Sequence, residues 1–399
     1  MTLFPSREIL KRRADIALIA AFFVFLWLPT ADSFLHLDQA ASPNENRPPA
    51  ACPVFQPSLK GTREFLAGFE AWFADHFGWR RQLVRWEQRL KWTLFRDSRI
   101  ANVLVGKEGW LFFSDGRTVD DISGARPFSD ADLDEWLTLL TGRRDWLRER
   151  GIRYLFVIPP DKQSIYPEHL PDWLIARART PRRIDQLLAH VRAHSDVPIL
   201  DLRETLLDAK KLATVYLQTD THWNDRGALA ASRRIVSEVS ALGVPVTPPD
   251  GDAFSETRLS ESGGDLARML GQEKYLLERD KPVLDPRPPL GLPALLPDPK
   301  LVFKTWIPGT EPLALNNPAA TGKIVLFRDS FAIALSKFLG VSFGRVVYVW
   351  QQNWDRRIIE LEKPDIVVDE MLERFVISRD PREMKKGDDQ METQLFGDR

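Results

Sequence analysis

The chain has 399 residues, 44% of them hydrophobic, and its 55 basic and 56 acidic residues leave a formal net charge of -1. This balance, with no basic tract, excludes nucleic acid as an expected partner, and a chain of this length can bury a large core without disulfides. Cys52 is the only cysteine, so an internal disulfide and a cysteine-based metal cluster are also excluded.

The N-terminal segment places a basic cluster (Arg7, Lys11, Arg12 and Arg13) before an apolar run from Ile16 to Leu28. Extended to Leu37, this run reaches roughly 20 residues, close to the thickness of a bilayer core at about 1.5 Å per residue. Basic residues on the N-terminal side predict an N-terminus inside and the remainder outside. We therefore expect a cytoplasmic N-terminus (1–13) and a transmembrane signal anchor (14–37) in the inner membrane, with the rest in the periplasm. A cleaved signal peptide is the alternative.

The next two segments are expected to connect and to pack. Residues 38–61 are polar and contain many prolines, which is typical of a linker. Residues 62–100 form a helical segment, because Phe65, Phe69 and Trp72 begin a series of apolar residues at three- and four-residue spacing. The thirteen tryptophans of the chain are expected to pack in cores, with stacking on saccharides as the alternative.

From residue 101 the pattern changes to short strands and then to alternating helices and strands. In chain order the sequence predicts a strand pair within 103–113, helix 129–150 with Ser129 as its N-cap, strand 152–158, helix 180–194, strand 198–202, a short helix to 211, and helix 225–242 with Asn224 as its N-cap. After a proline-rich insertion at about 247–320 it continues with strand 323–327, helix 330–339, strand 345–350, helix 354–362 and strand 365–369. This order predicts an α/β fold with a doubly wound, mostly parallel sheet over residues 101–378. Residues 379–399 are expected to be a charged, frayed tail.

Two stretches about a hundred residues apart carry the candidate chemistry. Ser330 lies between a buried strand and a helix, where ligands bind in open α/β sheets and where helix N–H groups can stabilise an oxyanion. A serine nucleophile needs a base, for which His222 is the best candidate, and Asp220 could orient its imidazole. Ser330 as an ordinary helix cap, and His222 as an ordinary loop histidine, are the alternatives.

These residues resemble a known family. The stretch from Asp220 through His222 to Asn224, followed later by a strand leading into Asp329-Ser330-Phe331, is similar to the SGNH-hydrolase-like acetyltransferase domain of the alginate O-acetyltransferase AlgJ/AlgX-like family. Residues 106–113, 160–167 and 370–374 also resemble it, so the likeness covers roughly 101–374. The resemblance implies Ser330 as nucleophile, His222 as base and Asp220 as orienting acid, in an order that looks permuted relative to ordinary SGNH esterases.

The chain departs from the family pattern at Arg328, where the family usually has glycine before Asp-Ser-Phe. A close backbone approach would favour glycine, so Arg328 either alters the loop or adds a cation near the cleft. Lys162 and Tyr166, which follow a strand end, and Arg374, which follows the last strand, are secondary candidates for substrate binding. For each of these three a structural role is the preferred interpretation, and substrate binding is the alternative.

The resemblance implies an O-acetyltransferase that adds acetyl groups to an exported polysaccharide, alginate or a similar exopolysaccharide. Ser330 would carry the acetyl group as an ester, and a separate multi-spanning membrane O-acyltransferase would supply it. We expect no cofactor and no metal. A periplasmic carbohydrate acetylesterase is the nearest alternative function, and a non-catalytic polysaccharide-binding scaffold is another.

Overall fold

The computed structural model describes residues 7–35, 50–55, 57–76, 78, 83, 86, 99–100, 102–115, 117–288, 290–301 and 310–396. The chain divides into two compact units, one of residues 1–101 with 268–271 and the other of residues 102–267 with 272–399.

The first unit contains α1 (Arg7–Leu35), α2 (Leu59–His76) and β1 (Arg99–Ile100). The apolar run of the predicted anchor falls on α1, while residues 36–37, most of the predicted linker and most of residues 77–98 lie outside the described residues. None of the helices searched within the described residues is both long and apolar enough to cross a membrane. On α2, the rings of Phe65 and Phe69 stack at 6.0 Å, as their four-residue spacing predicts.

The second unit is built on a seven-stranded sheet in the order β5-β4-β12-β10-β11-β9-β8. Its strands are β4 (Arg153–Ile158), β5 (Ile199–Asp201), β8 (Leu296–Pro297), β9 (Leu313–Asn316), β10 (Lys323–Phe327), β11 (Arg345–Val349) and β12 (Ile366–Glu370). The strands from β5 to β11 in this order pair in parallel, whereas β9 pairs antiparallel with both β11 and β8. The sheet is thus mixed, with the expected parallel strands at its centre.

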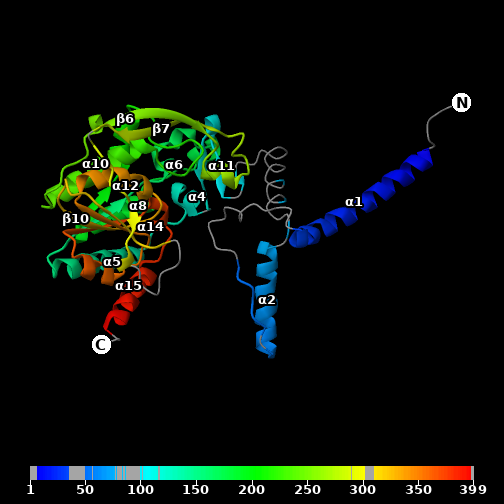
Figure 1. Cartoon of the computed structure of the whole chain (residues 1–399), viewed down its shortest axis with the longest axis horizontal. Helices are drawn as coiled ribbons and strands as arrows, with labels where there is room; N and C mark the ends of the chain where they lie inside the picture. Colours follow the sequence, from blue (N-terminus) through cyan, green and yellow to red (C-terminus); the bar gives the residue numbers. More distant parts are fainter. Residues whose placement is uncertain are drawn as a thin grey trace. The chain divides into compact units, whose positions relative to one another are not determined.

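Helices cover both faces of this sheet. Figure 1 shows α10 and α12 on one side of β10 and α5 and α15 on the other. The helices are α4 (Arg117–Ile122), α5 (Asp130–Arg148), α6 (Lys162–Ile165), α7 (Asp172–Ile175), α8 (Arg183–His194), α9 (Arg203–Lys210), α10 (Asp225–Ala241), α11 (Asp265–Met269), α12 (Ala332–Ser342), α13 (Arg356–Glu362), α14 (Glu373–Val376) and α15 (Pro381–Phe396). Outside the sheet, β2 (Val103–Val105) pairs with β3 (Leu111–Phe113) and β6 (Phe254–Glu261) with β7 (Glu278–Pro286).

The central strand β10 shows why the sheet is buried on both faces. Ile324 and Leu326 belong to the apolar core beneath α10 and α12, while Val325 and Phe327 belong to the core beneath α5, α8 and α13. Successive side chains of a strand point to opposite faces, so a continuous apolar run predicts a strand covered on both sides. The expected bounds of β10 agree with the structure at both ends.

Local capping signals also correspond to the helix starts. Ser129 caps α5 in a reciprocal arrangement with Asp132, and the side chain of Asn224 accepts hydrogen bonds from the first backbone N–H groups of α10. Such caps depend on neighbouring residues only, which explains their visibility in the sequence.

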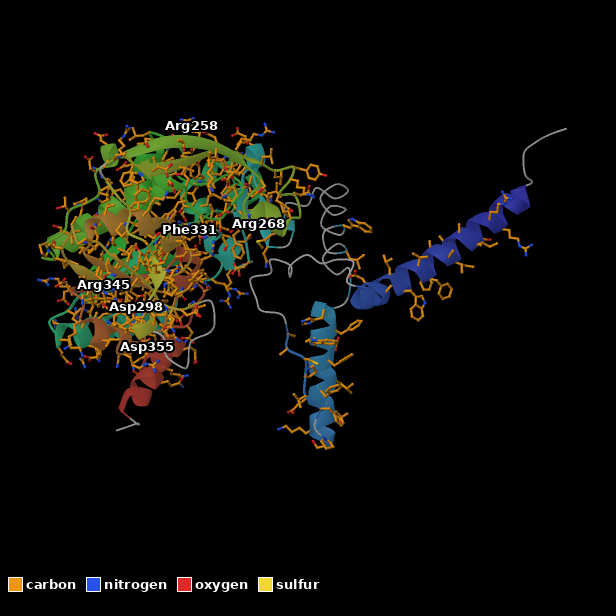
Figure 2. All side chains as sticks on the ribbon, viewed as in Figure 1. Arg258, Arg268, Asp298, Phe331, Arg345 and Asp355 are labelled. Carbon is orange, nitrogen blue, oxygen red and sulfur yellow. The ribbon has the colours of Figure 1, made fainter. Side chains whose placement is uncertain are left out.

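Two segments differ from the expectations. Within the predicted insertion, β9 pairs antiparallel with β11, and Asp298 near β8 forms an ion pair with Arg345 of β11 at 2.7 Å (Figure 2). Part of the insertion therefore extends the central sheet. The expected frayed tail instead forms the helix α15, from which Asp388 pairs with the buried Arg143 of α5 at 2.8 Å. Because this helix is rich in charged residues, its sequence does not indicate that Asp388 has a buried partner.

Candidate active site

The turn between β10 and α12 presents Ser330, which is half-buried. The carboxylate of Asp329 holds this turn: one oxygen accepts the backbone N–H of Phe331 at 2.8 Å, and the other accepts that of Leu372 at 2.8 Å. The backbone N–H of Asp329 in turn donates to Glu370 at 2.9 Å. The side chain of Asp329 thus accepts a backbone N–H of the turn, as a capping serine would. This leaves the Ser330 hydroxyl available for another partner.

The hydroxyl of Ser330 meets the imidazole of His222. The distance from His222 Nε2 to Ser330 Oγ is 2.9 Å, and that from His222 Nδ1 to Asp220 Oδ1 is 2.7 Å. When the Nδ1–H of His222 donates a hydrogen bond to Asp220, Nε2 is left as the acceptor for the serine hydroxyl. The three residues therefore have the geometry of a nucleophile, a base and an orienting acid, as their types and spacing predict.

The protonation state of Asp220 agrees with an orienting role. Burial alone would raise the pKa of its carboxyl group, but the hydrogen bond and charge of His222, with the backbone N–H groups of Asp265 and His222, outweigh burial and hold this pKa below its usual value. Asp220 is consequently ionised at neutral pH and can stabilise a protonated imidazole.

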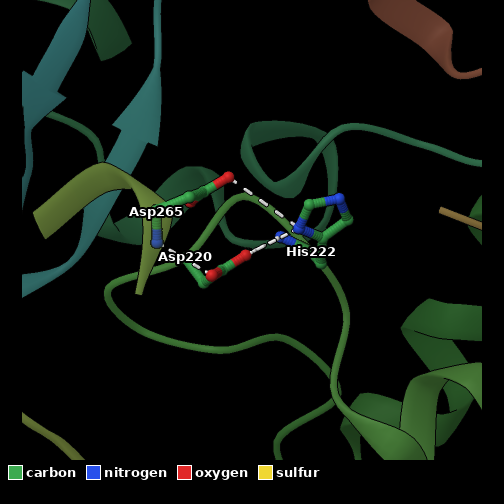
Figure 3. Close-up of side chains that lie close together, drawn as sticks. All are labelled: Asp220, His222 and Asp265. Carbon is green, nitrogen blue, oxygen red and sulfur yellow. Dashed lines mark hydrogen bonds and ion pairs between the residues drawn. The ribbon is translucent and has the colours of Figure 1, made fainter. Parts of the chain in front are cut away.

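Asp265 is a second carboxylate at this site, and it was not selected as a site residue from the sequence. Its backbone N–H donates to Asp220 Oδ2 at 2.9 Å, and its carboxylate lies 3.8 Å from His222 Nδ1 (Figure 3). The same carboxylate accepts hydrogen bonds from the backbone N–H and the hydroxyl of Thr221 at 2.7 and 2.5 Å. A Cβ on Gly264 would lie 2.4 Å from the Cβ of Asp220, so this approach needs glycine. The glycine that precedes Asp265 is the signal in the sequence that could have marked this position.

Asp220, His222 and Asp265 offer ligand atoms within 4.8 Å of one another, a spacing that a metal ion could use. However, both carboxylates already accept backbone N–H hydrogen bonds that fix them around the imidazole. These hydrogen bonds explain why the three side chains lie close together, with the carboxylates supporting the imidazole of His222. We assign no metal to this cluster.

Lys162 lies beneath the histidine loop. Its ammonium donates to the carbonyl oxygens of Leu217, Gln218 and Asp220 at 3.0, 3.1 and 2.6 Å. Burial lowers the pKa of Lys162 to about 7, against the opposing effect of the nearby carboxylates, of which Asp220 is the strongest. The three carbonyls account for its donors, so the buried side chain supports the loop from within, and its contact with a substrate stays a prediction.

Tyr166 is also buried. Its hydroxyl accepts the backbone N–H of Val215 at 2.9 Å, and its ring stacks on Trp110 at 4.3 Å. The structure therefore shows a packing role for Tyr166, and its part in substrate binding stays a prediction.

The two candidate arginines contact residues that neighbour the serine in the chain. Arg374 is half-buried, donates to Asp161 at 2.9 Å, and has its guanidinium 5.9 Å from the ring centroid of Phe331. Arg328 is buried, donates to the carbonyl of Asp329 at 3.0 Å, and lies 4.5 Å from the ring centroid of Trp350. The turn thus accommodates arginine at the position where the family pattern has glycine.

Comparison with known proteins confirms the resemblance. Residues 103–283 match the family described as "SGNH hydrolase-like domain, acetyltransferase AlgX". This match includes Asp220, His222 and Asp265 but stops before Ser330. The serine is brought to the matched region by the fold, through its contact with His222.

Several curated relatives are described as probable alginate O-acetylase AlgJ. The chain is 32% identical to that of Pseudomonas aeruginosa over 187 residues, which cover 46% of this chain and 44% of the relative. It is 28% identical to that of Pseudomonas syringae pv. tomato over 201 residues, covering 50% and 49%. The chain thus spans about half the length of the curated relatives it matches.

Solved structures of other proteins were also compared with this chain. Bacillus cereus PatB1 superposes with a TM-score of 0.50 at 15% identity, covering 70% of this chain and 98% of that structure. The O-acetyltransferase domain of Pseudomonas putida AlgJ covers 72% of this chain and 99% of its own, with a TM-score of 0.46 at 20% identity. The family match and PatB1 together support an SGNH-hydrolase-like fold for the second unit.

Proposed function

We propose that this protein is an O-acetyltransferase that adds acetyl groups to an exported polysaccharide, alginate or a similar exopolysaccharide. The observation that carries the proposal is the chain of contacts from Asp220 through His222 to Ser330, at 2.7 and 2.9 Å. The likeness of residues 103–283 to an acetyltransferase domain, and the AlgJ relatives, support acetyl transfer to a saccharide as the reaction.

The proposed reaction has two halves. In the first, His222 Nε2 takes the hydroxyl proton as Ser330 Oγ attacks the acetyl carbonyl carbon, and the protonated imidazole returns that proton to the leaving group. In the second, His222 takes the proton of a sugar hydroxyl, whose oxygen attacks the acetyl-serine ester. The sugar ester leaves, and Ser330 regains a proton. Asp220 stabilises the imidazolium that forms in each half.

The proposal places this chemistry in the periplasm. Residues 14–37 would anchor the protein in the inner membrane with a single pass, because basic residues precede the apolar run. A multi-spanning membrane O-acyltransferase would then supply acetyl groups to the periplasmic side. The order of Asp220 and His222 before Ser330 would make the fold a permuted SGNH arrangement.

The nearest alternative is an acetylesterase, since water can attack the same acetyl-serine. The side chain of His222 is 30% exposed, so a solvent molecule can reach the base. The full-length protein in detergent should therefore be given a small acetyl ester with and without a uronate oligosaccharide. Acetylated oligosaccharide supports the transferase, whereas acetate release that the oligosaccharide leaves unchanged supports the esterase.

Ser330→Ala distinguishes the two enzymatic functions, transferase and esterase, from a non-catalytic scaffold. Loss of a catalytic serine removes several orders of magnitude of turnover. Unchanged acetylation of the polymer in cells carrying Ser330→Ala would overturn the enzymatic proposal and favour the scaffold.

A further inference from the structure

Two threonines flank the orienting acid in the chain, and both are buried. Thr219 precedes Asp220 and Thr221 follows it, with exposed fractions of 2% and 4%. The hydroxyl oxygen of Thr221 also lies 3.2 Å from Nδ1 of His222. Neither threonine takes part in the proposed chemistry. Because buried hydroxyl groups are ordinarily hydrogen-bonded, the partners of these two side chains show what holds the loop.

Each threonine binds one carboxylate through two of its own donors. The backbone N–H and the hydroxyl of Thr219 donate to the same oxygen of Glu278, at 2.8 and 2.7 Å. The backbone N–H and the hydroxyl of Thr221 donate to the two oxygens of Asp265, at 2.7 and 2.5 Å. Glu278 is the first residue of β7 and Asp265 the first residue of α11, so both carboxylates come from outside the loop. We call these four residues the threonine clamp.

The hydroxyl of Thr219 also accepts a hydrogen bond, which extends the clamp to Asp220. Because an ionised carboxylate only accepts, the single proton of this hydroxyl is committed to Glu278. Its oxygen then accepts the backbone N–H of Gly264 at 2.9 Å. The next N–H along the chain, that of Asp265, donates to Asp220 Oδ2 at 2.9 Å (Figure 3). Glu278 is thereby connected to the orienting acid through one hydroxyl and two adjacent backbone N–H groups.

The contact to Oδ2 decides how the carboxylate of Asp220 faces the imidazole. Oδ1 accepts the backbone N–H of His222 at 3.0 Å and lies 2.7 Å from His222 Nδ1. Oδ2 has one hydrogen-bond partner in the described part of the chain, the backbone N–H of Asp265. A carboxylate that is held at both oxygens cannot turn about its Cβ–Cγ bond, so Oδ1 stays aligned with Nδ1.

The clamp is distinct from the support that Lys162 gives to the same loop. The ammonium of Lys162 binds carbonyl oxygens, whereas the carboxylates of the clamp bind N–H groups and hydroxyls. Loss of the Thr219 hydroxyl leaves the bonds of Lys162 in place and removes the connection to Oδ2 of Asp220. The two supports can therefore be tested separately.

We propose that Thr219 and Glu278 are positioning residues that set the orientation of the Asp220 carboxylate against His222. They act through the backbone N–H groups beside Oδ2 and touch no reacting atom. This inference rests on the proposed function, because it assigns both residues a task in activating the nucleophile. A structural role alone would lower stability without changing the hydrogen bond between the carboxylate and the imidazole.

Thr219→Val removes the hydroxyl and keeps the shape of the side chain. In the full-length protein with a small acetyl ester, we expect kcat to fall about tenfold, because small misplacements of reacting groups are costly. KM should stay within about twofold, since the clamp touches no substrate. Thr219→Ser keeps the hydroxyl and should retain kcat within about threefold of the wild type. An unchanged kcat in Thr219→Val would overturn the proposal.

Thr118→Val is the matched control. The backbone N–H and the hydroxyl of Thr118 also donate to one carboxylate, that of Asp115, both at 3.1 Å, and Thr118 is buried. The pair lies at the start of α4. The substitution removes the same group from the same kind of pair and should leave kcat within about twofold. Equal loss of kcat in Thr118→Val and Thr219→Val would overturn the positioning role.

Proton NMR supplies a measurement that a purely structural role would not change. A proton held between imidazole Nδ1 and a carboxylate resonates at unusually low field, and His222→Gln assigns this signal by removing it. Thr219→Val should move the resonance upfield or broaden it, whereas Thr118→Val should leave it in place. An unmoved resonance in folded Thr219→Val would overturn the proposal.

Glu278→Gln is the second variant if Thr219→Val does not fold. Glutamine removes the charge to which the threonine hydroxyl is committed, so the resonance should change in the same direction, with a smaller loss of kcat. An unchanged resonance and kcat in Glu278→Gln would overturn the proposal. Ser330→Ala tests the proposed function separately. If it is inactive while both clamp variants leave the resonance in place, the proposed function stands and only the positioning role falls.

Discussion

The indole N–H of Trp223 donates a hydrogen bond to the carbonyl oxygen of Phe331 over 3.1 Å. Trp223 directly follows the candidate base and Phe331 directly follows the candidate nucleophile, so one contact joins the two loops at the site. Their rings also meet edge to face at 5.1 Å. The distance between His222 and Ser330 therefore depends on a buried pair that itself takes no part in the proposed chemistry.

Trp223→Phe should separate the role of this hydrogen bond from that of the ring. It keeps an aromatic side chain but removes the N–H, so we expect about 1 kcal/mol less unfolding free energy. We expect a fall of about tenfold or more in kcat for a small acetyl ester, because small misplacements of reacting groups are costly. Trp136→Phe is the control: Trp136 is buried in the other core, and its N–H has no partner among the described residues. Equal loss of kcat in both variants would contradict the prediction.

Lys162→Met should loosen the loop that carries Asp220. The substitution leaves three carbonyl oxygens without their buried donor, which should cost at least about 2 kcal/mol of unfolding free energy. Turnover of the acetyl ester should fall at a temperature where the variant is folded. Urea unfolding and steady-state kinetics measure the two effects. Lys211→Met, at a lysine whose side chain is 75% exposed, should change neither quantity appreciably.

Asp265→Asn should lower turnover of a small acetyl ester. The amide keeps the backbone contact to Asp220 but removes a negative charge 3.8 Å from His222 Nδ1. A nearby negative charge stabilises the imidazolium that forms during the proposed reaction, so its loss should lower kcat by up to about fivefold. Asp285→Asn, on β7, should leave kcat unchanged. An unchanged kcat in Asp265→Asn would show that Asp265 does not act on the base.

Glu370→Gln tests the buried carboxyl group behind the nucleophile turn. Burial and the charge of Asp329 raise the pKa of Glu370 well above its ordinary value of 4.5. Between these two values the folded state holds a proton that the unfolded chain has released, so unfolding free energy falls as pH rises. The glutamine variant lacks this contribution and should lose less stability with rising pH, by up to about 1.4 kcal/mol per pH unit.

Urea unfolding at pH 5, 6.5 and 8 would measure that difference for Glu370→Gln. Glu360→Gln, at a carboxylate paired with Arg150 on the surface, is the control and should follow the wild type. Parallel stability curves for the wild type and Glu370→Gln would mean that Glu370 is ionised in the folded protein.

Asp388→Ala should reveal how far α15 stabilises the second unit. Asp388 pairs with Arg143 at 2.8 Å, and its other oxygen accepts the backbone N–H of Trp354 at 2.7 Å. Removing one partner of a buried ion pair costs about 3–5 kcal/mol, although Asp369 still pairs with Arg143 and should limit the loss to the lower end. Thermal and urea unfolding measure it. Asp389→Ala, at the neighbouring half-exposed carboxylate that pairs with Lys385, should cost less than about 0.5 kcal/mol.

The elements that could be predicted from the sequence are those specified by residues close together in the chain. The apolar run of β10, the Ser129 cap of α5 and the Asn224 cap of α10 agree with the structure because periodicity and capping act over a few residues. The helix α15 could not be predicted in this way. Its charged surface suggested a solvated tail, and its partner Arg143 is 245 residues away in the chain.

The sequence by itself determined that Ser330 lies between a strand and a helix, and that Asp220 and His222 lie two residues apart before another helix. Only the tertiary structure decided that these stretches meet, because the order of strands in the sheet brings together residues 108 positions apart. It also added Asp265 beside the imidazole and showed that Lys162 binds the backbone carbonyl of Asp220. Such contacts depend on how distant elements pack, and no local pattern of residue types records that packing.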